Sequence, residues 1–206
     1  LSLITTCASG IKLEKEFGVS SVESEVAKLD TIIQSSNYLS KTIDDFRNFF
    51  KPNKEKNYFS IEEMTEQSIS LINASFAFHY IKINKNFANI EKVFGFPNEF
   101  SQAILNVLAN AKDVLVQKEI ENPQVNINIY ENEEFGFLEI EDNGGGINPN
   151  ILIKIFEPYF TTKEKNQGTG IGLYMSKMIV EKNMSGKLTV INTSIGAKFI
   201  FAIPKE

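Results

Sequence analysis

Three amide side chains follow one another at helical spacing in the middle of the chain. Gln102, Asn106 and Asn110 are four residues apart, a spacing that places side chains along one stripe of a helix. Carboxamide oxygens suit Mg²⁺, which takes few protein ligands and fills its octahedron with water and phosphate. A polar stripe that only faces solvent explains the same spacing equally well, so this segment alone does not decide between the two.

A carboxylate and several glycines come next, where an expected strand gives way to a loop. Asp142 ends the run Glu139-Ile-Glu-Asp and is followed by Gly144 and Gly146. A carboxylate in that place can accept a hydrogen bond from an exocyclic amine such as that of adenine. Glycines let the backbone approach a flat ligand where a side chain would collide. The alternative is an ordinary Asn-Gly turn at the end of a strand.

A third segment combines aromatic residues, a lysine and glycines ahead of a helix. Glycine-rich backbone that runs into a helix N-terminus offers N–H groups and a favourable dipole to phosphates, and Lys163 adds a point charge. Phe156 and Phe160 would anchor a mobile loop at one end. The glycines are not a Walker A motif, because no Lys-Ser/Thr follows them. They do not follow a strand of a βαβ unit, which excludes the dinucleotide-binding motif.

Helices dominate the first quarter of the chain. We expect one helix over residues 1–17, closed by Gly18, and a second helix that begins with a capping box of Ser20 and Glu23. One narrow apolar seam of coiled-coil type runs along the second helix. It consists of Val22, Val26, Leu29, Ile33, Leu39, Ile43, Phe46 and Phe50. A hairpin with one seam buries itself poorly alone, so we expect two copies to form a four-helix bundle.

Helix and strand signals alternate in the rest of the chain. Lys51-Pro52 would stop the second helix, and residues 53–58 would link the hairpin to the remaining three quarters of the chain. We expect a helix from the Ser60/Glu63 capping box to about Ala74, a strand over 78–83 and a helix over 97–117. The residues expected on the buried side of this last helix are Phe100, Ile104, Val107, Leu108, Ala111 and Leu115. A hairpin of 125–129 and 137–142, a helix over 172–182, and strands 187–193 and 198–203 joined by the turn 194–196 complete the chain. Helices and antiparallel hairpins in this order indicate an α+β fold, a two-layer sandwich.

Composition limits the classes of function. The chain has 206 residues, 42% of them hydrophobic, and a net charge of −5, which argues against nucleic acid as a partner. A single cysteine, Cys7, excludes an internal disulfide framework, and a single histidine, His79, excludes a histidine-rich metal centre. We find no signal peptide and no run long enough to span a membrane. We therefore expect a cytoplasmic piece of a longer protein, with membrane anchoring of that protein left open.

Taken in order, the motifs resemble those of the ATP-binding catalytic domain of sensor histidine kinases. This family is a branch of the superfamily that also holds gyrase, Hsp90 and MutL ATPases. The matching segments are 106–111 for the N box, 142–147 for the first glycine box, 156–160 for the F box and 168–173 for the second glycine box. The resemblance implies the Bergerat ATP-binding fold over residues 59–206. Residues 1–52 are similar to the second part of a dimerisation and phosphotransfer domain, which implies a homodimer.

The resemblance also implies a role for individual residues. Asn110 would coordinate Mg²⁺, with Asn106 beside it near the triphosphate, and Asp142 would hold the adenine amine. The segment from about 156 to 172 would be the ATP lid. The residues expected to bind ATP are Asn106, Asn110, Asp142, Gly144, Gly146, Ile147, Phe156, Phe160, Thr162, Lys163, Gly168, Thr169, Gly170, Gly172 and Leu173.

One position separates a kinase from a hydrolase within the superfamily. Hydrolytic members resemble one another in a glutamate four residues before the metal-binding asparagine, and here that position is Asn106. An amide cannot take a proton from water at neutral pH, which leaves Asn106 a positioning role in phosphoryl transfer and Gln102 a supporting one. The resemblance therefore implies transfer of the γ-phosphoryl group to a histidine, and from there to an aspartate of a response regulator.

The acceptor histidine is expected upstream of Leu1. The family's box around it typically ends in a Pro-Leu pair, and this chain opens with Leu1-Ser-Leu-Ile. His79 lies between Phe78 and Tyr80 in the expected catalytic domain, where an outward polar position is the simpler interpretation. Two alternatives stay open: a nucleotide-binding regulatory module without phosphotransfer, and an ATPase of the gyrase or Hsp90 kind, against which Asn106 counts.

Overall fold

The computed structural model describes residues 2–49, 55–163 and 168–205, and side-chain surroundings for these ranges apart from residues 2, 37–39 and 41–49. The chain divides into two compact units. One unit consists of residues 1–52 and 161–169, and the other of residues 53–160 and 170–206. Among the described residues, no helix has the length and apolar character needed to cross a bilayer.

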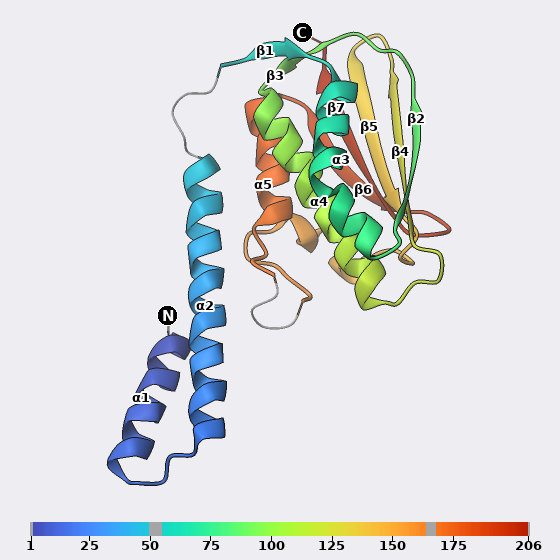
Figure 1. The fold of residues 1–206 in the computed structure, drawn as a ribbon. Coiled ribbons are helices and arrows are strands. Elements are labelled where there is room, and N and C mark those ends of the chain that lie inside the picture. Colours follow the sequence, from blue (N-terminus) through green and yellow to red (C-terminus); the bar gives the residue numbers. More distant parts are fainter. Residues whose placement is uncertain (1, 50–54, 164–167, 206) are drawn as a thin grey trace. The chain divides into compact units, whose positions relative to one another are not determined.

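The first unit contains the expected helical hairpin. Helix α1 (Ser2–Glu16) and helix α2 (Val22–Phe49) lie side by side in Figure 1, and Gly18 in the turn has a positive φ of 68°. The predicted capping box is wrong by one residue. Ser21 caps α2, because its Oγ accepts from Ser24 N at 3.1 Å, whereas Ser20 Oγ donates to the carboxylate of Glu25.

The seam of α2 is left uncovered within the hairpin. The side chains of Val22, Val26, Leu29 and Ile33 are 74%, 50%, 48% and 56% exposed. Polar contacts link the helices instead: Ser24 Oγ donates to a Glu14 oxygen at 3.2 Å. The remaining seam residues, Leu39, Ile43, Phe46 and Phe50, and the Lys51-Pro52 stop lie outside the described side chains.

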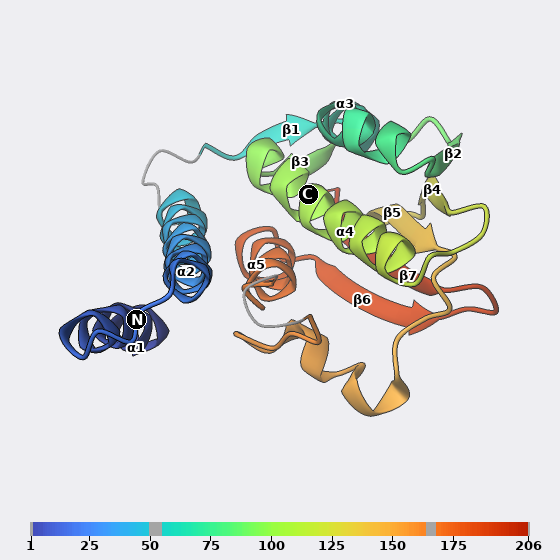
Figure 2. The same cartoon turned by 60° about the horizontal axis from the view of Figure 1, so that its bottom comes forward.

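The second unit is a two-layer α+β sandwich, as the sequence predicts. Its five-stranded sheet has the order β2-β4-β5-β7-β6, with β2 parallel to β4 and every other pair antiparallel. The strands are β2 (Lys82–Phe87), β4 (Gln124–Glu131), β5 (Phe135–Asp142), β6 (Lys187–Asn192) and β7 (Ala197–Pro204). Three helices cover one face of this sheet (Figure 2), namely α3 (Ile61–Phe78), α4 (Pro97–Gln117) and α5 (Gly172–Met178).

The remaining elements are short. Strands β1 (Asn57–Phe59) and β3 (Val93–Gly95) form an antiparallel pair that the sequence did not predict. Two 3₁₀ turns, η1 (Pro149–Ile151) and η2 (Lys154–Phe156), precede the lid segment. A π-helical stretch, η3 (Ile179–Asn183), continues α5, so the predicted helix over 172–182 is present with a wider last turn.

The core lies between α4 and the sheet. All six residues predicted on the buried side of α4 are at most 5% exposed. Phe100 joins the layers, since its ring lies 5.3 Å from that of Phe59 and 5.8 Å from that of Phe201. Burial alternates along β4 and β5, as expected for strands with one face covered. The long α4 is therefore fixed along its length against the sheet.

The predicted strand over 78–83 is wrong. The Ser60 cap is confirmed, with Ser60 Oγ accepting from Glu63 N at 3.2 Å, but the helix continues past Ala74 to Phe78. A turn follows, with Tyr80 at φ 56°, and the strand begins only at Lys82. The alternation of apolar and polar residues from Phe78 to Ile83 spans the end of a helix, a turn and the start of a strand. It does not reflect a single strand.

Candidate functional site

Asp142 lies at the end of β5 and is almost fully buried. The residue is 5% exposed, and its Oδ1 accepts from Gly144 N at 2.8 Å and from Ala197 N at 3.4 Å. Burial raises the pKa of the Asp142 carboxyl above its ordinary value, and these two hydrogen bonds act in the opposite direction. Both bonds end on Oδ1, which leaves Oδ2 to accept from a further donor.

The glycine loop after Asp142 is held by backbone and amide contacts. Gly145 N donates to Ile195 O at 2.9 Å in the turn between β6 and β7. Asn192 clamps Ile147 from both sides: Ile147 N donates to Asn192 Oδ1 at 2.8 Å, and Asn192 Nδ2 donates to Ile147 O at 2.7 Å. A Cβ on Gly146, whose φ is 79°, would lie 2.8 Å from Asn192 Oδ1. The clamp therefore requires glycine at that position.

Lys118 at the end of α4 reaches the same loop. Its Nζ donates to Gly144 O at 2.6 Å, and its positive charge opposes the rise in the pKa of Asp142. Val114, one turn earlier, lies so close that a Cβ on Gly144 would be 3.0 Å from it. Val114 and Lys118 continue the four-residue spacing of Gln102, Asn106 and Asn110.

The amide stripe of α4 is joined at Asn106 to the start of α5. Asn106 Nδ2 donates to Gly172 O and to Ser176 Oγ, both at 3.2 Å. Ser176 is itself fully buried and donates to Gly172 O at 3.0 Å. The stripe thus runs from the start of α5 to the glycine loop, and Gln102, Asn106 and Asn110 are each half-buried along it. This arrangement favours a binding site over a face open to solvent.

The F box is built on one aromatic contact and one cation–π contact. Phe156 packs edge-on against Phe199 with a centroid distance of 6.4 Å, and Lys177 Nζ lies 4.9 Å above the Phe156 ring. Gly170 ends the lid segment with a φ of 65°, and a Cβ there would lie 2.5 Å from the backbone carbon of Tyr159. The two ends of the lid therefore touch through backbone, which only glycine at position 170 allows.

The inner part of the lid belongs to the unit that contains the hairpin. Thr162, Lys163, Gly168 and Thr169 lie in the segment 161–169. Lys163 N donates to Thr161 Oγ1 at 3.1 Å, and a Cβ on Gly168 would lie 2.9 Å from the same oxygen. Leu173 follows Gly172 in the first turn of α5. His79 is the C-cap of α3 and contacts Phe78 edge-on at 5.0 Å.

Several residues that contact the glycine loop, Asp142 or Asn106 were not predicted from the sequence, among them Lys118, Ser176, Asn192 and Gly196. Lys118 could have been found, because it continues the four-residue spacing of the amide stripe. Asn192 and Gly196 carry no such signal, since their role depends on the turn between β6 and β7 folding back onto Asp142.

Removal of the Lys118 charge is expected to weaken nucleotide binding and change its pH dependence. Lys118→Met loses the bond to Gly144 O. Because of this loss we expect the affinity for ATP to be about three- to tenfold lower at neutral pH. Loss of the positive charge also raises the pKa of Asp142 further. Because the ionised carboxylate is the better acceptor, binding should fall away at a higher pH in Lys118→Met than in the parent protein.

Calorimetric titration of ATP across pH 5 to about 8 measures both effects. Lys118→Arg serves as the control, since it keeps the charge near Asp142. If ATP affinity falls at the same acidic pH in Lys118→Met as in the parent protein, Lys118 acts only through its bond to the glycine loop.

Residues 95–206 match the family model described as histidine kinase-, DNA gyrase B- and HSP90-like ATPase. The chain belongs to this family. The match covers α4, the glycine loop, the lid and the last two strands, which are the elements that build the site. The predicted resemblance to sensor histidine kinases is confirmed by the relatives as well.

Several curated relatives are sensor kinases. The chain is 42% identical over 115 residues to the two-component sensor PprA of Pseudomonas aeruginosa, which covers 54% of this chain and 12% of that protein. It is 26% identical over 187 residues to sporulation kinase A of Bacillus subtilis, covering 90% of this chain and 28% of that protein. The chain thus spans between about an eighth and a quarter of the length of these relatives.

Solved histidine kinases share the fold. The catalytic domain of histidine kinase ThkA superposes with a TM-score of 0.65 at 28% identity, covering 73% of this chain and 96% of that domain. A structure of ThkA in complex with the response regulator TrrA matches 99% of this chain and 58% of that chain, with a TM-score of 0.74 at 21% identity. The second match includes the hairpin, and at this identity it bears on fold alone. This chain therefore carries the ATP-binding domain of a sensor histidine kinase.

The residues present fit a nucleotide with its magnesium ion. Asp142 offers a carboxylate oxygen beside a glycine loop, and α4 offers amide oxygens along one stripe. Among the described residues, no group of three or more His, Cys, Asp or Glu side chains gathers where a metal could bind. A cation at the stripe would have few protein ligands, which is the usual situation of Mg²⁺ held largely by water and phosphate.

Proposed function

We propose that the chain is the ATP-dependent protein histidine kinase core of a two-component sensor. In this proposal Asp142 accepts a hydrogen bond from the adenine amine, and Gly144 and Gly146 line the base pocket. Bound Mg·ATP supplies the γ-phosphoryl group and the cation that offsets its charge. The protein's contribution is positioning and charge neutralisation, which are the main requirements of phosphoryl transfer.

The hydrogen bonding of Asn106 is the observation that favours phosphoryl transfer over direct hydrolysis of ATP. Its amide nitrogen donates to Gly172 O and Ser176 Oγ, which fixes the direction of the amide group. The side chain therefore holds the start of α5 and cannot act as a base toward water. Asn110, one turn later, is proposed as the Mg²⁺ ligand, and Gln102 as a supporting group. Lys163 and the glycines at 168, 170 and 172 are proposed to face the phosphates when the lid closes.

Dimerisation through the hairpin is part of the same proposal. The exposed apolar seam of α2, with Val22, Val26, Leu29 and Ile33 between 48% and 74% exposed, supports a second copy as its cover. The acceptor histidine is proposed to lie upstream of Leu1, and an aspartate of a response regulator is proposed as the next acceptor. The ThkA–TrrA complex is a precedent for that kind of partner.

Transfer of label from γ-labelled Mg·ATP tests the proposal. A longer protein that includes residues before Leu1 should become labelled in an acid-labile, base-stable form, and the 206-residue chain alone should bind ATP without becoming labelled. If both bind ATP and neither accepts label, the chain is a regulatory nucleotide-binding module. Steady release of phosphate without labelled protein would favour an ATPase.

Replacement of Asn106 by aspartate separates positioning from base catalysis. Asn106→Asp is isosteric but cannot donate to Gly172 O or Ser176 Oγ, so we expect a loss of about 1–3 kcal/mol of stability. We expect no gain in ATP hydrolysis, because the new carboxylate faces a carbonyl oxygen. Thermal unfolding and phosphate release measure the two effects, and Asn106→Ala is the control for removal of both bonds. A rise in hydrolysis without loss of stability would contradict the positioning role.

A further inference from the structure

Strand β2 leaves one edge of the sheet open. Lys82 N donates to Pro123 O and Ala88 N donates to Ile129 O, both at 2.9 Å, so even-numbered residues of β2 face β4. In a parallel ladder the alternate residues direct their N–H and C=O groups the other way. Ile83, Lys85 and Phe87 therefore present unpaired backbone groups at this edge, and no strand among the described residues pairs with it.

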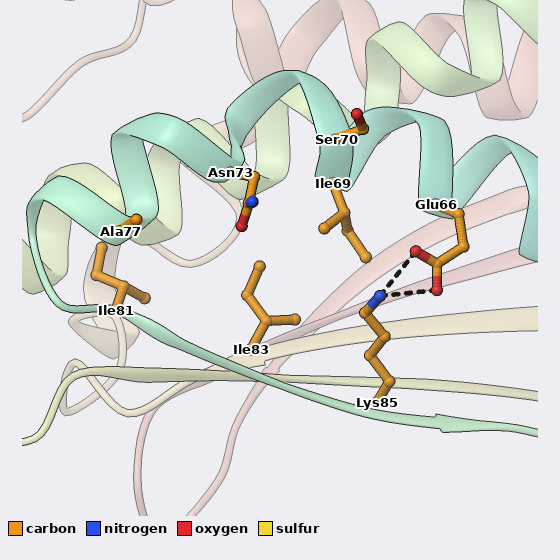
Figure 3. Close-up of a pocket in the computed structure, with 8 residues that line it drawn as sticks. All are labelled: Glu66, Ile69, Ser70, Asn73, Ala77, Ile81, Ile83 and Lys85. Atoms are coloured by element: carbon orange, nitrogen blue, oxygen red, sulfur yellow. Dashed lines mark hydrogen bonds and ion pairs between the residues drawn. The ribbon is translucent and has the colours of Figure 1, made fainter.

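A groove follows this edge between β2 and α3. It has a volume of about 470 Å³ and is lined by Glu66, Ile69, Ser70, Asn73, Ala77, Ile81, Ile83 and Lys85 (Figure 3). Ile69 and Ile81, each 6% exposed, lie at its base, and the polar side chains of Glu66, Ser70, Asn73 and Lys85 share the lining. Lys85 Nζ bonds to the two oxygens of Glu66 at 2.8 and 2.7 Å at one end, which leaves the stretch against Ala77, Ile81 and Ile83 open at the other. None of these residues belongs to the nucleotide site.

Three large side chains near the end of α3 are exposed without lining the groove. Leu71 and Phe78 on α3 and Tyr80 in the following turn are 74%, 78% and 88% exposed. Tyr80 adopts a φ of 56°, which is an uncommon conformation for a bulky residue. The case for binding therefore rests on the free edge of β2 and on the lining of the groove.

Charge indicates which kind of chain fits. Residues 82–87 contain Lys82 and Lys85 and no acidic residue, and residues 67–80 contain no acidic residue either, although the chain carries a net charge of −5. A second copy of β2 would place four lysines on a pair of strands that carries no acidic residue, which is unfavourable. An acidic strand would meet the opposite charge at Lys82, whose side chain lies on the face away from α3.

We propose that this groove binds a short extended segment of a partner protein, which adds as a strand to the free edge of β2. Its alternate side chains are apolar where they enter the groove against Ala77, Ile81 and Ile83, and at least one is acidic where it faces Lys82. Backbone hydrogen bonds supply affinity and the groove supplies selectivity, as in other cases of strand addition to a sheet edge. The proposal is independent of the phosphotransfer function.

The test uses a synthetic peptide of about seven residues in which valine alternates with glutamate. In the 206-residue chain, we expect the amide protons of Ile83, Lys85 and Phe87 to become protected from exchange when the peptide is added. A peptide with lysine for glutamate, and one with methylated backbone nitrogens on its pairing edge, should each bind at least about tenfold more weakly.

Matched variants locate the contact. Ala77→Glu and Ala74→Glu add the same charge to exposed positions of α3, but only Ala77 lines the groove. Lys82→Glu and Lys92→Glu make the same comparison for the charge on the strand. We expect Ala77→Glu and Lys82→Glu to weaken binding at least about tenfold and their partners to leave it unchanged, with ATP affinity equal in all four.

Three results would overturn the proposal. The first is equal binding of the methylated peptide, which would exclude strand addition. The second is equal weakening by both members of either variant pair. The third is a change at β2 that depends on protein concentration without any peptide, which would make a second copy the occupant.

Discussion

Replacement of Asp142 by asparagine is expected to lower the affinity for ATP about 30- to 1,000-fold, a loss of about 2–4 kcal/mol. The carboxylate accepts from the adenine amine in the proposed complex, and an asparagine NH₂ turned toward that amine would oppose one donor with another. The backbone bonds of Gly144 and Ala197 to Oδ1 can still be made to the amide oxygen. These two bonds therefore direct the NH₂ group toward the ligand.

The same substitution should not weaken the fold. Burial raises the pKa of Asp142, so the folded state binds its proton more tightly than the unfolded state. A carboxyl of this kind lowers stability as pH rises through its folded pKa, because the buried charge must then form. Asparagine removes that cost, and the unfolding temperature at neutral pH should stay equal or rise while ATP binding is lost. Loss of binding with preserved stability is the mark of a ligand contact.

Inosine triphosphate sharpens the measurement. Its base carries a carbonyl oxygen in place of the amine, so Asp142→Asn should bind it as well as or better than the parent protein does. Glu141→Gln is the matched control, because Glu141 is the neighbouring residue on β5 and faces the opposite side of the sheet. Calorimetric titrations of both nucleotides with the three proteins are sufficient. Equal losses for ATP and inosine triphosphate would place Asp142 outside the base pocket.

The elements that carry the site could be predicted because their signals are local. Helix α4 has a proline at its start and an apolar face that repeats from Phe100 to Leu115, and its predicted bounds agree with the structure. The Asp142 loop and the turn at residues 194–196 are marked by glycines next to strands with clear alternation. Each of these features depends on residues within a few positions of one another.

The remainder depends on contacts between distant segments. The parallel pairing of β2 with β4 leaves no trace in either strand, and the residues before β2 alternate by accident across a helix end. Asn192 holds Ile147 from 45 positions away. Such contacts are set by how the sheet order brings segments together, and periodicity within a segment carries no information about them.

Gly196 is the residue whose replacement should harm fold and site together. A Cβ at this position would lie 1.9 Å from the backbone oxygen of Asp142 and 2.7 Å from its Oδ1. The backbone of Asp142 cannot shift as easily as the end of a flexible side chain. The turn between β6 and β7 must therefore move away to make room for the Cβ. That movement would break the bond from Gly145 N to Ile195 O and the bond from Ala197 N to Asp142.

For Gly196→Ala we expect a loss of about 3 kcal/mol of stability, at the upper end for overpacking of a buried site. In a chain of this size that is a fall of about 6–12 °C in unfolding temperature. ATP affinity should fall with it even at temperatures where the variant is folded, because Asp142 loses both its neighbour and its orientation. Calorimetry and ATP titration at low temperature separate the two effects.

Gly10→Ala is the control for the same chemical change. Gly10 lies within α1, and a Cβ there would make ordinary contact, 3.6 Å from the Lys28 side chain. Alanine in a helix interior is expected to stabilise the hairpin by about 0.5–1 kcal/mol and to leave ATP binding unchanged. If Gly196→Ala kept both its unfolding temperature and its ATP affinity, the turn between β6 and β7 would have room to move, and the close approach to Asp142 would not be what fixes the base pocket.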